Sequence, residues 1–179
     1  MKDFKINARS VYKGHHQITY RGIKAIKCPF DYVIYQMILF EIKPDLVIEI
    51  GGNKGGGALY LADIMEIIDH GVLHTIDVAD NFDPLVKNHK RIKMFTDGYQ
   101  SYDVNQINQF NHILIIEDAS HLYEDSLNCL NKFSQFVSVG SYYIVEDGII
   151  DKLGMRKEYN GGPKKAVKEF LKKTNEFEI

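Results

Sequence analysis

The sequence lacks the features that mark nucleic-acid-binding, disulfide-bonded and membrane-spanning proteins. Its formal net charge is only −2, so no excess of positive charge favours nucleic acid as a partner. The 2 cysteines, Cys28 and Cys129, lie far apart in the chain and match no metal-binding spacing. Read as reduced thiols, they predict a cytoplasmic protein. No apolar run reaches the ~20 residues that a membrane helix needs, and the polar start of the chain predicts no signal peptide.

Length and composition predict a single α/β domain. The chain has 179 residues, 45% of them hydrophobic, which is enough to form a buried core. Residues 1–28 are polar, basic and without a regular pattern, and they are predicted to be an N-terminal arm or lid. Residues 29–179 are predicted to form the domain, which no repeat or low-complexity segment interrupts. These observations are compatible with a homo-oligomer.

The most informative stretch runs from Val47 to Leu61. A short apolar run passes through Glu49 and breaks into glycines at Gly51, and apolar residues then resume at helical spacing from Leu59. This pattern predicts a buried strand, a tight turn and the start of a helix. Glycines allow the backbone to approach a ligand closely, and a helix start offers unpaired N–H groups to an anion or a carboxylate. A strand-to-helix turn without a ligand is the alternative interpretation.

Strands and helices are predicted to alternate along the rest of the domain. A helical pattern begins at Asp31 and ends before Pro44. Strands are predicted at residues 45–50, 72–78, 92–95, 112–116 and 142–145, with a last short strand at 177–179. Such alternation predicts a Rossmann-like α/β fold, in which helices cover both faces of a mostly parallel, twisted sheet.

Acidic residues stand at the ends of four predicted strands. They are Glu49, Asp77, Glu117 with Asp118, and Glu146 with Asp147. Parallel sheets bind ligands beyond the carboxyl ends of their strands, and dinucleotide-binding folds place an acid for ribose hydroxyls near the position of Asp77.

Three of these acids are candidate metal ligands. Asp118, Glu146 and Asp147 are predicted to lie on neighbouring strands, where they would repel one another unless a cation lay between them. Carboxylate oxygens suit Mg²⁺ or another hard divalent cation. The alternative is a set of solvated acids that cap the following helices.

His121 is the candidate general base. It follows Glu117 and Asp118 closely in the chain, and histidine is the side chain that ordinarily titrates near neutral pH. The alternative is a surface or structural histidine.

Several segments together resemble one known family, the cephalosporin hydroxylase/rhamnosyl O-methyltransferase family. The segments are Lys27–Pro29, Lys43–Gly51 with the glycine cluster, Asp118–His121, Gly140–Asp147 and Gly161–Pro163. The similarity covers roughly residues 26–179. It implies a class I methyltransferase fold that uses S-adenosylmethionine (SAM). One departure is Ser120, because this family usually has an acid there.

The resemblance also implies roles for individual residues. The turn at Glu49, Gly51 and Gly52 would hold the methionine part of SAM, Asp77 would bind the ribose hydroxyls, and Asp97–Gly98 would lie beside the adenine. The predicted cofactor-binding residues are Glu49, Gly51, Gly52, Asn53, Gly55, Asp77, Val78, Asp97, Gly98 and Asp118. The predicted metal ligands are Asp118, Glu146 and Asp147, and the predicted catalytic residues are His121 and Asp118.

The leading hypothesis is a SAM-dependent O-methyltransferase, with Mg²⁺ as an optional second cofactor. It would methylate a hydroxyl of a small molecule or a sugar by in-line displacement at the sulfonium methyl. One alternative is an NAD-dependent oxidoreductase, although Asn53 stands at the second glycine position of the dinucleotide-binding motif. The other is a non-catalytic protein that binds the cofactor. No membrane partner is expected.

Overall fold

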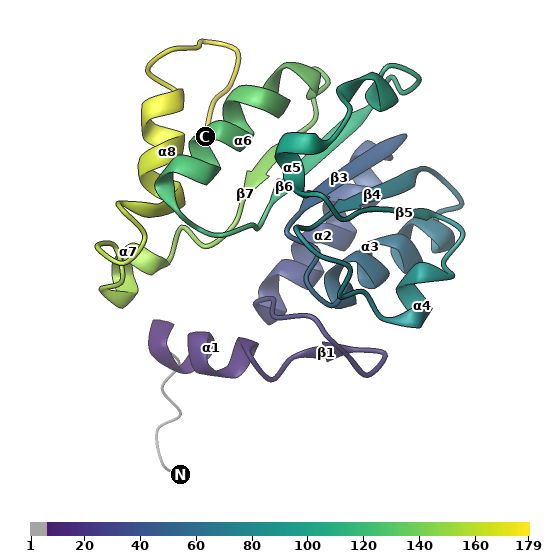
Figure 1. Ribbon diagram of the computed structural model, residues 1–179, viewed down its shortest axis with the longest axis horizontal. Helices are drawn as coiled ribbons and strands as arrows, with labels where there is room; N and C mark the ends of the chain where they lie inside the picture. Colours follow the sequence, from purple (N-terminus) through teal and green to yellow (C-terminus); the bar gives the residue numbers. More distant parts are fainter. Residues whose placement is uncertain (1–6) are drawn as a thin grey trace.

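The computed structural model describes residues 7–179. They form a five-stranded parallel sheet with helices on both faces, and a separate two-stranded sheet near the N-terminus (Figure 1). The sheet order is β5-β4-β3-β6-β7, and every neighbouring pair is parallel. The strands are β1 (Thr19–Tyr20), β2 (Ile23–Lys24), β3 (Leu46–Ile50), β4 (Val72–Ile76), β5 (Ile92–Phe95), β6 (Ile113–Glu117) and β7 (Tyr143–Val145). The α-helices are α1 (Ala8–His15), α2 (Pro29–Ile42), α3 (Gly56–Ile67), α4 (Pro84–Lys87), α5 (Gly98–Ser101), α6 (Tyr123–Phe133), α7 (Ile150–Leu153) and α8 (Gly162–Phe170). Two 3₁₀ helices, η1 (Val104–Ile107) and η2 (Ser134–Phe136), complete the described secondary structure.

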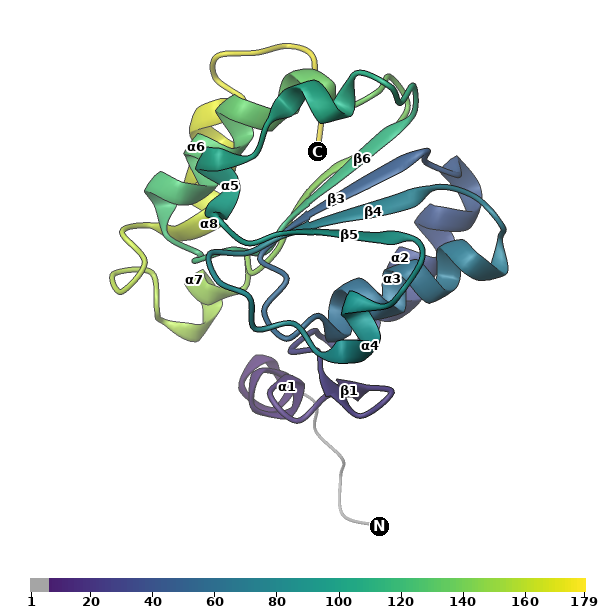
Figure 2. The same cartoon turned by 45° about the vertical axis from the view of Figure 1, so that its right-hand side comes forward.

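The central strand β3 is buried on both faces. Helices α2, α3 and α4 cover one side of the sheet, and α5, α6 and α8 lie on the other (Figure 2). Because successive strand residues point to opposite faces, Val47 packs with Leu59 and Leu61 of α3. Leu46 and Ile48 pack in the opposite layer with Phe133 of α6. This double burial explains the continuous apolar runs in the sequence.

The predicted fold class is confirmed, and the structure corrects both ends of the chain. Residues 177–179 are not a strand; Phe177 instead packs its ring against Phe170 of α8, with centroids 5.8 Å apart. The N-terminal arm contains helix α1 and the hairpin β1–β2, where the sequence suggested no regular structure. Asn7 and Ser10 start α1 with reciprocal hydrogen bonds between side chain and backbone. Residues 1–6 of the predicted arm lie outside the described part, and the division at residue 28 stays a prediction.

Among the helices of residues 7–179, none combines the length and the apolar character that crossing a membrane requires. A cytoplasmic location stays a prediction.

The strand register brings the predicted acids to one edge of the sheet. Ile50 of β3 lies opposite Ile76 of β4 and Glu117 of β6, and Glu117 lies opposite Val145 of β7. The residues that follow these strand ends therefore meet at the same edge.

Candidate active site

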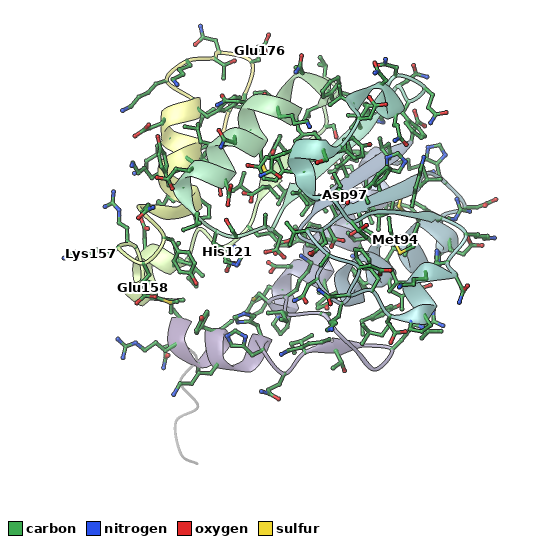
Figure 3. All side chains as sticks on the ribbon, viewed as in Figure 1. Met94, Asp97, His121, Lys157, Glu158 and Glu176 are labelled. Carbon is green, nitrogen blue, oxygen red and sulfur yellow. The ribbon has the colours of Figure 1, made fainter. Side chains whose placement is uncertain are left out.

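A cavity of about 540 Å³ opens at this edge of the sheet. The loops that follow β3, β4, β6 and β7 line it, and helix α1 and residues 24–27 of the arm form the facing wall. Figure 3 shows His121 reaching into the space between the strand ends and α1. Sequence-distant segments thus share one cavity.

Glycine is required at several positions after β3 because neighbouring atoms leave no room for a side chain. Gly51 has φ +104°, and a Cβ there would lie 2.0 Å from the carbonyl oxygen of Asp118. At Gly52 a Cβ would lie 2.3 Å from the Thr75 hydroxyl. Both residues line the cavity with Asn53, whereas Gly55 faces Val86 of α4, 2.6 Å from an added Cβ. The structure therefore assigns Gly55 to the contact with α4, outside the cavity lining.

Glu49 is the buried acid at the base of the cavity. Only 1% of it is exposed, and its Oε2 accepts a hydrogen bond of 2.7 Å from the Thr75 hydroxyl. Burial raises the pKa of this carboxyl, and the nearby Lys27 ammonium opposes the rise.

Asp77 fixes the turn that lines the cavity. One carboxylate oxygen accepts from the backbone N–H of Asn53 at 2.6 Å, and the other accepts from Val78 N–H at 2.7 Å. Asp77, Val78 and Gly98 all line the cavity. Asp97 is exposed and does not line it, so of the two residues predicted beside the adenine only Gly98 lies at the cavity, and their role stays a prediction.

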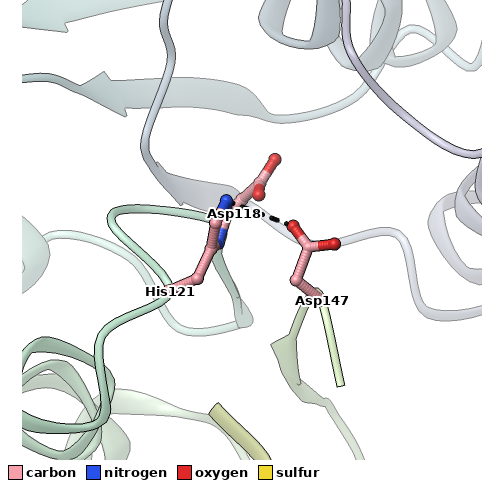
Figure 4. Close-up of side chains that lie close together, drawn as sticks. All are labelled: Asp118, His121 and Asp147. Carbon is pink, nitrogen blue, oxygen red and sulfur yellow. Dashed lines mark ion pairs between the residues drawn. The ribbon is translucent and has the colours of Figure 1, made fainter. Parts of the chain in front are cut away.

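Asp118, His121 and Asp147 form a cluster in the lining of the same cavity. One ligand atom from each residue lies within 4.8 Å of the others. His121 Nε2 is 3.3 Å from Asp147 Oδ2 (Figure 4). Two carboxylates and an imidazole can together hold a divalent cation or hold and move a proton.

Glu146 departs from its predicted place among the metal ligands. Its Oε1 lies 2.5 Å from Lys27 Nζ and 2.5 Å from the Tyr35 hydroxyl. The geometric cluster therefore contains His121 where the sequence led us to expect Glu146.

The arm supplies residues to which the sequence assigned no role. Tyr12 and His15 of α1 and His16, which directly follows this helix, line the cavity, and burial lowers the pKa of His15. Lys27 is buried between Asp118 and Glu146. In the sequence, only the adjacent pair His15 and His16 could have pointed to a site in this polar segment. That the pair lines the cavity is evident only from the tertiary structure.

Glu117, the last residue of β6, should lower the stability of the protein at high pH. Burial raises its pKa to about 7, from an ordinary value of 4.5. Between these values the folded state keeps a proton that the unfolded state loses, so stability falls as the pH rises through this window. We expect Glu117→Gln, which resembles the protonated form, to be more stable than the wild type at pH 8 by up to ~3 kcal/mol. The difference should vanish near pH 4.

Urea unfolding at the two pH values measures this difference. Glu176→Gln is the control, because it makes the same substitution at an exposed position. Identical pH dependence in the wild type and Glu117→Gln would contradict the prediction.

The parallel sheet, the glycine turn and the acidic strand ends define a Rossmann-like α/β protein with a ligand site at the carboxyl ends of its strands. The comparison with known families identifies the chain more narrowly. It belongs to the rhamnosyl O-methyltransferase/CmcI family, whose profile matches residues 12–179. The predicted family, fold class, SAM as cofactor and O-methyltransferase class are confirmed, and the match favours SAM over NAD.

Individual relatives agree with this assignment. A rhamnosyl O-methyltransferase of Mycobacterium leprae is 26% identical over 159 residues, which are 85% of this chain and 69% of that protein. Its counterpart in Mycobacterium tuberculosis is 30% identical over 162 residues, which are 85% and 65% of the two chains. The chain thus spans about two thirds of the length of these relatives.

Solved structures share the fold. A CmcI structure described with Mg and SAM has a TM-score of 0.66 at 18% identity, covering 87% of this chain and 67% of its own. The O-methyltransferase NovP has a TM-score of 0.61 at 14% identity, covering 83% and 74%.

Proposed function

We propose that this protein transfers the methyl group of SAM to a hydroxyl of a sugar or small molecule, with a divalent cation at the acidic edge. One observation carries the proposal: the glycine turn and the Asp118–His121–Asp147 cluster line the same cavity. A methyl donor at one end and a hydroxyl at the other would meet inside it. The sugar hydroxyl is suggested by the names of the mycobacterial relatives.

The cavity fits the cofactor in size and in chemistry. Its volume of about 540 Å³ falls in the range of small-molecule sites. We assign Asp77 to the ribose hydroxyls, because its carboxylate lies at the cavity wall and retains unused acceptor capacity beside its two backbone bonds. Gly51 and Gly52 bring backbone close to the methionine end, and Glu49 lies at the base below them.

His121 is the proposed base, and Asp147 orients it. SAM, when bound, would supply a methyl group on a positively charged sulfur: the acceptor oxygen bonds to the methyl carbon, the carbon–sulfur bond breaks, and the sulfur leaves as a neutral thioether. When His121 Nε2–H donates to Asp147 Oδ2, the Nδ1 atom is left to accept the proton of the acceptor hydroxyl. The Asp147 carboxylate then stabilises the imidazolium that forms.

The donor set of the cluster fits a divalent cation. The carboxylates of Asp118 and Asp147 suit Mg²⁺ or Mn²⁺, and the imidazole of His121 is then left to act as the base. Such a cation, when bound, supplies positive charge that favours the ionised form of a nearby hydroxyl. Glu146 as a further ligand stays a prediction, as do a homo-oligomer and the lack of nucleic-acid and membrane partners.

Calorimetry and an acceptor screen test the proposed function. SAM should bind the purified protein and NAD should not. With labelled SAM, a panel of sugars and phenols should contain a methylated acceptor, and EDTA should lower the rate that Mn²⁺ or Mg²⁺ restores. Failure to bind SAM would overturn the proposal.

Replacing Asp77 with alanine should weaken SAM binding. A lost hydrogen bond to a charged group costs ~1.5–3 kcal/mol, which corresponds to roughly 10- to 150-fold in affinity. Asp80→Ala is the matched control, since Asp80 is an exposed acid on the same loop that does not line the cavity.

A ribose-modified cofactor separates ribose binding from an effect on the turn. A 2′-deoxy analogue of SAM should lose less affinity than SAM does on Asp77→Ala. Equal losses for both ligands would show that Asp77 acts only by holding Asn53 and Val78.

A further inference from the structure

Lys27 brings a buried positive charge to the acidic edge. Only 4% of the residue is exposed, and its Nζ lies 2.8 Å from Asp118 Oδ2 and 2.5 Å from Glu146 Oε1. Both partners were expected from the sequence to bind a metal. An ammonium group thus already compensates part of the charge that a divalent cation would neutralise.

The backbone on both sides of Lys27 accommodates its side chain. Ile26, immediately before it, has φ +28°, which is rare for a β-branched residue and indicates local strain. On the facing side, a Cβ at Gly57 would lie 2.7 Å from Cε of Lys27 and 2.9 Å from Glu49 Oε1. The first turn of α3 therefore leaves space that the lysine fills.

Lys27 also lines two cavities. It lines the 540 Å³ cavity and a second one of about 400 Å³, which is bounded by α2 and by the loop after β7. Tyr35 of α2 donates to the same Glu146 oxygen that contacts Lys27. Glu146 is thus held on the side of α2, away from His121. Although burial disfavours the ammonium, Asp118 and Glu146 outweigh this effect and raise the pKa of Lys27 well above its ordinary value.

We propose that Lys27 is a positioning residue whose buried ammonium group acts as a permanent cation of the site. It holds the carboxylates of Asp118 and Glu146 in place. It thereby confines a divalent cation to the cluster of Asp118, His121 and Asp147. It occupies Asp118 Oδ2 and repels a second positive charge, so it weakens divalent binding. The inference rests on the cation of the proposed function, but it concerns the residues of this chain. The N-terminal arm thereby sets how strongly the site depends on metal.

The test is a Mn²⁺ titration of the whole chain without SAM or acceptor, followed by calorimetry and by melting temperature. We expect Lys27→Met to melt at a lower temperature without metal, because it leaves two buried carboxylates uncompensated. It should bind Mn²⁺ at least about tenfold more tightly than the wild type, and Mn²⁺ should raise its melting temperature more. Lys27→Arg, which keeps the charge, should retain an affinity close to that of the wild type.

Two further variants keep the test decisive. Lys13→Met removes the same charge from an exposed position in the arm that lines neither cavity, so it should leave Mn²⁺ affinity near that of the wild type. The double variant Lys27→Met/Glu146→Gln removes one buried acid together with the lysine, and it answers the same question if Lys27→Met does not fold. Its melting temperature without metal should recover, and its Mn²⁺ affinity should exceed that of the wild type.

The outcomes separate this inference from the proposed function. Mn²⁺ affinity in Lys27→Met and in Lys27→Met/Glu146→Gln equal to or lower than that of the wild type would overturn the role of Lys27. Mn²⁺ binding by Lys27→Met but not by the wild type would support the role of Lys27 and refute the cation in the proposed function.

Discussion

Replacing Asp147 with asparagine should reduce methyl transfer at least ~100-fold, the usual lower range for losing general-base assistance. Asp147 orients His121 through the 3.3 Å contact and belongs to the candidate cation cluster. Asparagine fits the backbone there, because Asp147 has φ +55° and asparagine tolerates this conformation well. Removing one of several neighbouring acids should leave the protein without metal no less stable.

Three measurements on Asp147→Asn check this expectation. Initial rates with labelled SAM should fall, SAM affinity should change less than about threefold, and the rise in melting temperature with Mn²⁺ should shrink. The exposed Asp80→Asn is the control for loss of one acidic charge. Unchanged rates in Asp147→Asn, combined with indifference to EDTA, would remove both the cation and the Asp147–His121 pair from the mechanism.

Gly51→Ala should lower the free energy of unfolding by at least ~3 kcal/mol or prevent folding. The added Cβ would lie 2.0 Å from a backbone oxygen of Asp118, and the φ of +104° is itself unfavourable for alanine. The backbone cannot yield easily, because Asp118 N–H is hydrogen-bonded to Ile50 O at 2.8 Å across the two strand ends. The loss of cofactor binding in such a variant would follow from the damaged turn.

Gly148→Ala is the matched control for this substitution. An added Cβ at Gly148 has no heavy atom within 4 Å, so its stability should stay within ~0.5 kcal/mol of the wild type. Urea unfolding of both variants gives the comparison. A Gly51→Ala protein with wild-type stability would show that the ends of β3 and β6 can separate at little cost.

The sequence predicted the elements that periodicity and breaking residues mark clearly. The apolar runs gave the five strands of the parallel sheet to within a few residues, and Pro44 correctly ended the helix before β3. Residues 177–179 misled because a short apolar segment can pack one ring against a helix as readily as it can extend a sheet. The sequence missed α1 in the arm because this helix has only 8 residues and buries none of them, so few apolar positions mark it.

The candidate site likewise has some features that the sequence predicted and others that only the tertiary structure shows. A parallel sheet obliges residues at strand ends to meet, and the sequence therefore sufficed to bring Glu49, Asp77, Asp118 and Asp147 to one edge. Which acids face the cavity and which are already paired depends on side chains from other elements. Only the tertiary structure could turn Glu146 toward Lys27 and Tyr35 and place His121 beside Asp147, because these contacts join segments that no local pattern relates.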